Sequence, residues 1–166
     1  MNFRPKQFGV CLVLLSAALF AAPSQLCAQS LADKADKLVR LMKEDNFNYI
    51  TTSSPTVFTI HFTGDHLKDI KVILALGSDE DSDLVIFVTV TPKATMPTTA
   101  DFRYILLKAN HEYDQVKIGL DGDDDLSVRV DGSMRVADAT YLKNLVNQVK
   151  NSSDEIYGKI QPNLIP

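Results

Sequence analysis

The sequence has 166 residues, of which 45% are hydrophobic and 23% charged, and its formal net charge is −4 at pH 7. This acidic balance argues against nucleic-acid recognition, which needs a basic footprint, and equally against binding to an anionic membrane surface. Nucleic acid and membrane are therefore not expected as partners, and the length suits one domain with one hydrophobic core.

The N-terminal segment places two cations ahead of an apolar run over residues 8–22. That run is shorter than the about 20 residues that span a bilayer, and its composition is typical of a secretory signal peptide. With cleavage after Ala28, residues 1–28 are predicted to be a signal peptide and 29–166 a single domain, periplasmic or secreted, in a bacterium. Two alternatives stay open, an uncleaved membrane anchor and lipidation of Cys27.

The first half of the domain begins with a helical pattern and continues with strand patterns. Residues 31–44 carry apolar side chains at helical spacing behind Ser30, a favourable N-cap, so they predict an amphipathic helix. Alternation with a period of two then predicts three strands, joined by short connections into an antiparallel meander. These strands are residues 56–63, 69–77 and 84–91, and a further short strand at 49–53 stays open.

The second half repeats this plan on a smaller scale. Thr98 or Thr99 is predicted to cap a helix that runs to about Ala109, with Asn110 in the left-handed position that ends it. Two strands follow, joined by the hairpin turn Asp121-Gly122. They cover residues 116–120 and 126–130.

The last helix is predicted to begin after Asp138 and to reach about residue 160, either unbroken or interrupted near 151–153. The predicted order is therefore α-β-β-β-α-β-β-α. An antiparallel sheet with helices on one face makes this an α+β fold, a two-layer sandwich.

The acidic turns and the histidines do not predict a metal site. Three aspartates from Asp121 to Asp125 have the spacing of the first calcium ligands of an EF-hand, but Leu126 and Gly132 stand where the loop needs Gly and Glu. A zinc site needs three or four ligands, and the histidines are scattered. No metal and no cofactor are therefore expected. The histidines are His61, His66 and His111.

Catalytic motifs are also missing from the sequence. It contains no G-x-S-x-G, no H-E-x-x-H and no phosphate-binding glycine loop, and both cysteines lie in the predicted signal peptide. The prediction is a protein that is not an enzyme. A small-ligand sensor or hydrolase with an unrecognised pocket is the alternative, because sites can be grafted on a fold without a motif.

The second face of the meander is the feature that points to a function. If one alternating set packs on the helices, the other set points away from them, and it too is mostly apolar, unlike a face left to water. Such a surface marks a partner, a dimer contact or a covering element of the same chain. The predicted binding residues are Val57, Thr59, His61, Ile73, Ala75, Val85 and Phe87.

Three short stretches resemble a known family. They are Leu106-Leu107-Lys108-Ala109-Asn110, Val116-Lys117-Ile118-Gly119-Leu120-Asp121 and Asp125-Leu126-Ser127-Val128, and the tail Asp154-Glu155-Ile156-Tyr157 adds to them. This pattern resembles the YbjN-like bacterial domains, which are similar in fold to type III secretion chaperones. The resemblance implies a domain that often pairs as a dimer and, in the chaperone branch, holds an extended segment of a partner. It implies that Asn110 and Gly119 serve backbone geometry, and it brings no catalytic residue.

The sequence thus predicts an exported, non-enzymatic module that binds a protein or peptide, chaperone-like or regulatory, and that forms a homodimer. The predicted export puts a direct role in type III secretion in doubt. A third possibility, besides the sensor or hydrolase, is an accessory subunit of an envelope assembly.

Overall fold

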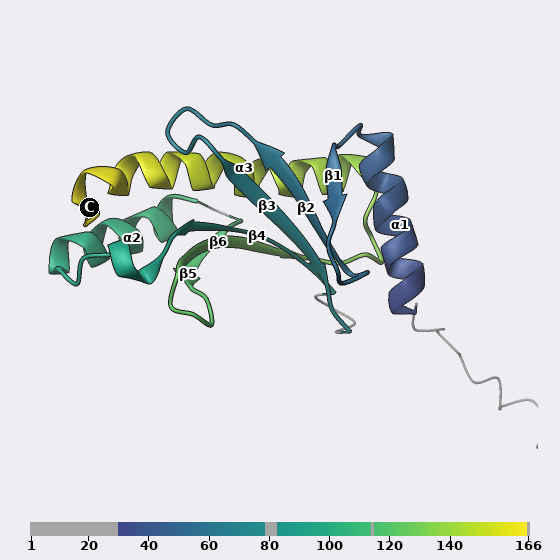
Figure 1. Ribbon diagram of the computed structural model, residues 1–166, viewed down its shortest axis with the longest axis horizontal. Helices are drawn as coiled ribbons and strands as arrows, with labels where there is room; N and C mark the ends of the chain where they lie inside the picture. The colour runs from purple at the N-terminus through teal and green to yellow at the C-terminus, as the bar shows by residue number, and fades with distance from the viewer. Residues whose placement is uncertain (1–29, 79–82, 114, 166) are drawn as a thin grey trace, which may run out of the picture.

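One antiparallel sheet of six strands, in the order β1-β2-β3-β4-β6-β5, forms the centre of the structure (Figure 1). The structure, a computed structural model, describes residues 30–78, 83–113 and 115–165. The helices lie against one face of the sheet and at its ends, so the predicted α+β fold class is confirmed. The predicted signal peptide, residues 1–28, lies outside the described residues.

The helices and strands follow one another in the predicted order, with one additional strand at the start of the sheet. This strand, β1, lies where the sequence leaves a short strand at residues 49–53 open. The helices are α1 (Leu31–Glu44), α2 (Ala100–Glu112) and α3 (Ala139–Ile160). The strands are β1 (Tyr49–Thr51), β2 (Val57–Phe62), β3 (Ile70–Leu76), β4 (Leu84–Thr91), β5 (Lys117–Leu120) and β6 (Leu126–Gly132).

Local capping sets the helix ends. Ser30 and Asp33 form a capping box, in which each side chain accepts a hydrogen bond from the other's backbone N–H. The chain leaves α1 through Asn46, whose φ of 56° is left-handed. α3 runs unbroken to Ile160, and the buried Ser153 fits within it because its hydroxyl donates to the carbonyl of Val149 at 2.6 Å.

The core lies between the sheet and the helices α1 and α3. Every second residue of the central strands is buried there, with β3 alternating between buried and more exposed positions. α3 contacts β3, β4 and β6, and α1 packs on α3 and β3. The fully buried side chains include Leu38, Ile70, Leu74, Ile86, Leu126, Leu142 and Ile156.

The prediction that Asn110 ends α2 is wrong. Asn110 lies inside the helix, which continues to Glu112, and its side chain binds the backbone of Ile118 in β5. Helix α2 thereby lies against the outer edge of the sheet. Asn110 favours a helix end by its local propensity, but here its side-chain amide binds the edge of β5 instead, and the helix continues past it.

A buried carboxylate on α3 holds the turn between β2 and β3. Asp154 accepts backbone hydrogen bonds from Asp65, His66 and Leu67 at 3.0, 2.9 and 2.7 Å. Burial acts to raise the pKa of Asp154, but the three N–H donors outweigh it, and the pKa lies below its ordinary value. A Cβ on Gly64 would stand 2.2 Å from the Asp154 carboxylate, so this close approach requires glycine.

A buried ion pair joins α1 to the start of β4. Lys34 Nζ lies 2.9 Å from Asp83 Oδ2, with only 10% and 3% of the two side chains exposed. The other oxygen of Asp83 accepts the backbone N–H of Met134 at 2.6 Å, between β6 and α3. Three segments far apart in the sequence are therefore fixed to one carboxylate.

Candidate functional site

The sheet has an outer face, opposite α1 and α3, and the structure brings the seven predicted binding residues together there. Antiparallel register aligns six of them in two rows across β2, β3 and β4. Ile73 is flanked by Thr59 and Phe87 in one row. Ala75 is flanked by Val57 and Val85 in the next row, and His61 lies opposite Lys71 at the end.

These residues differ in how far they reach solvent. Thr59 is only 4% exposed, so it forms part of the floor. His61 is exposed at the end of the face, with its Nδ1 3.1 Å from Asp69 Oδ1. The five others are half-buried: Val57, Ile73, Ala75, Val85 and Phe87. The outer face thus offers an apolar centre, and its role in binding stays a prediction.

A covering element was the alternative explanation for these apolar residues. Among the described residues, the helices pack on the opposite face or at the sheet ends, and none lies over the centre of the outer face (Figure 1). Residue Ile50 of β1, which pairs with Thr59, extends the apolar centre and is 57% exposed. Ile50 was not among the predicted residues because β1 is only three residues long.

Toward β6 and β5 the outer face becomes charged. Arg129 of β6 lies opposite Phe87, and Lys117 of β5 lies opposite Arg129. Both cations bind Asp131, with Arg129 Nη2 3.2 Å from its carboxylate. Burial acts to raise the pKa of Asp131, but the two cations outweigh it and hold the pKa below its ordinary value.

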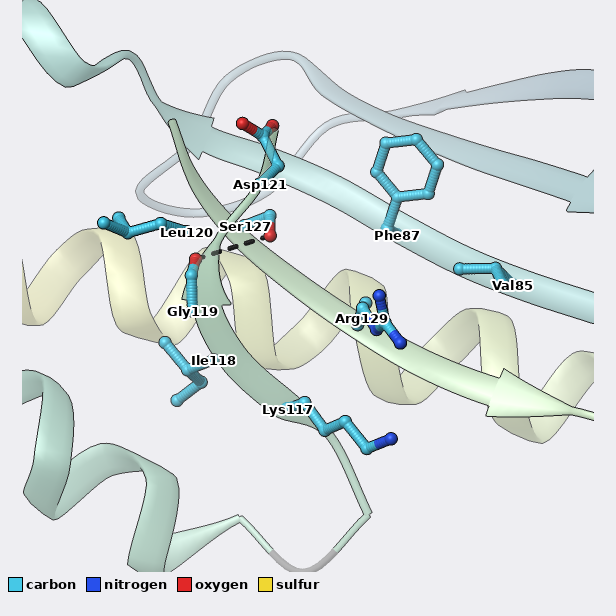
Figure 2. Close-up of a pocket in the computed structure, with 9 residues that line it drawn as sticks. All are labelled: Val85, Phe87, Lys117, Ile118, Gly119, Leu120, Asp121, Ser127 and Arg129. Carbon is cyan, nitrogen blue, oxygen red and sulfur yellow. Dashed lines mark hydrogen bonds between the residues drawn. The ribbon is translucent and has the colours of Figure 1, made fainter. Parts of the chain in front are cut away.

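A hollow of about 330 Å³ opens where the apolar and charged parts of the outer face meet (Figure 2). Phe87 of β4 and Arg129 of β6 stand beside it, while β5 contributes Gly119. The hydroxyl of Ser127 points to the carbonyl of Gly119 at 3.4 Å. The full lining is Val85, Phe87, Lys117, Ile118, Gly119, Leu120, Asp121, Ser127 and Arg129.

The structure does not support the expectation that Gly119 serves backbone geometry. Its backbone is not in the left-handed region, and a Cβ built at this position would meet no atom within 4 Å. The nearby Asp121 does have a conformational role, since its Oδ1 accepts the N–H groups of Asp123 and Asp125 at 3.0 Å. The three aspartates therefore form the turn between β5 and β6.

A second hollow, of about 440 Å³, lies along α3 and is lined mainly by amide side chains. Gln148 Nε2 donates to Gln115 Oε1 at 2.7 Å, while Gln148 Oε1 is buried without a partner. Neither hollow brings together an acid and a base in the way that hydrolysis requires. Among the residues that the structure places, no group of three or more His, Cys, Asp or Glu side chains is arranged to hold a metal.

The described residues contain the α-helices α1, α2 and α3. None of those helices combines the length and the apolar character that a transmembrane span needs.

Comparison with known proteins gives likeness in structure without likeness in sequence. No family model and no curated protein matches the chain. YbjN from E. coli, a proposed transcription regulator, superimposes with a TM-score of 0.57 at 15% identity, over 80% of this chain and 95% of YbjN. ExsC in the ExsC–ExsE complex gives a TM-score of 0.52 at 11% identity, over 73% of this chain and 88% of that chain. The Yersinia pestis type III secretion chaperone SycH, in complex with a fragment of YscM2, gives 0.49 at 17% identity, over 74% and 98%.

These neighbours contradict the predicted location. The prediction of a periplasmic or secreted protein is wrong, because ExsC, whose fold this chain shares, is a cytoplasmic type III secretion chaperone. The neighbours named above are chaperones and a proposed regulator, not enzymes. The likeness that was expected from three short stretches is confirmed at the level of structure. The chain has the fold shared by YbjN and the type III secretion chaperones.

Proposed function

We propose that this protein is a non-enzymatic module that binds a protein or peptide partner through the outer face of its sheet. One observation carries the proposal: the outer face is apolar across β2, β3 and β4, and no helix of the described residues covers its centre. Where one face of an antiparallel sheet remains in water, its strands normally alternate apolar residues toward the core with polar residues toward the water. Burial of this apolar centre by a partner would supply the free energy of association.

The fold supports a protein as the partner. ExsC, whose fold this chain shares, is seen in complex with another protein, ExsE. The open outer face also suits an extended segment or a broad surface more than a small molecule, which prefers a deep cleft. A hydrolase would need an acid and a base that converge on one point, whereas Asp121 lies at the other end of the first hollow from Lys117 and the second hollow is lined mainly by amides (Figure 2).

The test is capture of partners by the full chain in its native host, compared among three forms. Phe87→Asp places a charge at the centre of the outer face, where Phe87 is half-buried and its loss need not unfold the core. Val136→Asp is the matched control, because Val136 is apolar and 62% exposed but lies between β6 and α3, away from the outer face. Mass spectrometry identifies the captured proteins.

The expected result is a protein that the wild type and Val136→Asp capture and Phe87→Asp does not. Capture of the same proteins by all three forms would refute the proposal. Thermal unfolding of each variant is measured in parallel. If Phe87→Asp unfolds the domain, Ile73→Asp repeats the test from the neighbouring strand, since Ile73 lies opposite Phe87.

The proposal includes a homodimer, and we place its contact on α2. Tyr104 and Leu107 are 68% and 70% exposed, and residues three apart share one side of a helix. A two-fold dimer brings the same patch of both copies together, so the apolar stripe of Tyr104 and Leu107 would pack against its own counterpart. This arrangement leaves the outer face free for the partner.

A further inference from the structure

We infer that the hollow beside Gly119 is an anchor site, which takes one aromatic side chain of the partner next to a carboxylate. The inference rests on the proposed function, because it names the chemistry of the segment that the outer face binds. It starts from Gly119, a glycine that the backbone does not require. Glycine in a strand weakens it, and it often marks a site where another chain approaches closely.

The space at this position comes from the missing side chain. Gly119 pairs with Ser127, and Phe87 and Arg129 belong to the neighbouring row of the outer face. The small side chains at positions 119 and 127 therefore lie beside the large side chains of Phe87 and Arg129. The hollow of about 330 Å³ between them is at the lower end of small-ligand pockets, which leaves room for one large side chain.

The walls favour an aromatic side chain over an aliphatic one. The ring of Phe87 offers an edge-to-face or offset contact, and aromatic pairs are stabilised beyond the burial of their area. The guanidinium of Arg129 stands at the same hollow and attracts the face of an aromatic ring. Aromatic anchors of this kind carry much of the binding energy at protein interfaces.

Charge complementarity adds a carboxylate beside the aromatic ring. Lys117 and Arg129 line the hollow, and both bind the carboxylate of Asp131, which is not part of its lining. The lining itself holds two cations and one carboxylate, that of Asp121, in a chain whose net charge is −4. Asp121 lies at the far end, where its carboxylate is bound by two backbone N–H groups. An acidic residue of the partner would therefore sit over Lys117 and Arg129.

The test is an NMR titration of the isotope-labelled full chain with short Gly-Ser peptides. The probe peptide has a central Trp-Glu pair, and the comparison peptides have Ala-Glu or Trp-Lys in its place. Gly119→Val fills the hollow and, because a Cβ here meets no atom, is expected to keep the fold. Gly122→Val is the matched control, since its Cβ also meets nothing and Gly122 does not line the hollow.

The expected result is that the Trp-Glu peptide shifts the amide resonances of Phe87, Ser127 and Arg129. Gly119→Val should weaken this binding roughly tenfold, as loss of an anchor does, and Gly122→Val should leave it unchanged. Arg129→Gln should weaken it as well, which keeps the inference testable if Gly119→Val lowers the unfolding temperature. The comparison peptides should bind more weakly than the probe.

Three outcomes overturn the inference: no binding of the Trp-Glu peptide, equal binding of the Ala-Glu peptide, or wild-type affinity in Gly119→Val. The native partner separates this failure from failure of the proposed function. If Phe87→Asp loses that partner and Gly119→Val keeps it, the outer face binds but the anchor is wrong. If Phe87→Asp keeps the partner, the proposed function itself fails.

Discussion

The side chain of Asn110 pairs with the backbone of Ile118 as a neighbouring strand would. Its Nδ2 donates to the Ile118 carbonyl at 2.6 Å, and its Oδ1 accepts the Ile118 N–H at 3.0 Å. β5 is an edge strand, and an open edge is a template for pairing with another chain. The amide of α2 thus satisfies the middle of this edge and ties the helix to the sheet.

Asn110→Asp is expected to destabilise the protein by about 1–2 kcal/mol, because it replaces a donor by a second acceptor that faces the Ile118 carbonyl. Chemical unfolding measures the free energy change. Asn144→Asp, a change of the same kind at an exposed position of α3, is the control and should have little effect. Equal stability of the two variants would show that the Asn110 pairing contributes nothing.

Asp154 predicts a dependence of stability on pH. Its folded-state pKa lies below the unfolded value of about 3.9, so it stabilises the fold above that value. This contribution is lost as the pH falls through the folded-state pKa. Asp154→Asn should therefore cost about 1–3 kcal/mol at neutral pH, because the amide is a weaker acceptor for three N–H groups.

The measurement is the free energy of unfolding of wild type and Asp154→Asn from neutral to strongly acidic pH. The gap between the two curves should be largest at neutral pH and should close below about pH 4. Asp131, whose pKa is also lowered, titrates in both proteins and cancels in the difference. A gap that stays constant with pH would contradict the assigned role of Asp154.

The features that the sequence predicts correctly are those that depend on the pattern of neighbouring residues. The bounds of β4 follow from the period-of-two pattern over Leu84–Thr91, and the start of α1 follows from Ser30, the predicted N-cap. The seven residues of the outer face follow from the same alternation, since the period of two fixes which side chains share a face.

What the sequence does not predict depends on contacts between distant segments. Asn110 finds its partner across the α2–β5 connection, so its propensity to end a helix misleads. The hollow beside Gly119 needs the register that sets Arg129 between Phe87 and Lys117, and register across three strands is not visible in the chain order. The predicted location failed for a different reason: it rested on an N-terminal segment alone.

Lys34→Met is expected to destabilise the protein by about 3–5 kcal/mol, because it leaves the Asp83 carboxylate buried without its cation. Methionine keeps most of the volume of the lysine stem, so a change in packing explains little of the loss. Asp83→Asn in the Lys34→Met background removes the stranded charge and should recover part of the stability. Thermal and chemical unfolding measure both steps, and additive losses in the double variant would show that the two residues do not interact.

Leu107→Asp tests the homodimer. If α2 forms the contact, the wild type has the mass of a dimer in light scattering, and a charge at the exposed centre of the apolar stripe makes it a monomer. Leu107 is 70% exposed in the single chain, so the substitution leaves the core and the unfolding temperature nearly unchanged. Phe87→Asp, on the outer face, should remain dimeric, because the proposal gives that face to the partner. A wild type that is monomeric at all concentrations rejects the dimer, whereas a dimer that Phe87→Asp dissociates and Leu107→Asp does not would place the contact on the sheet.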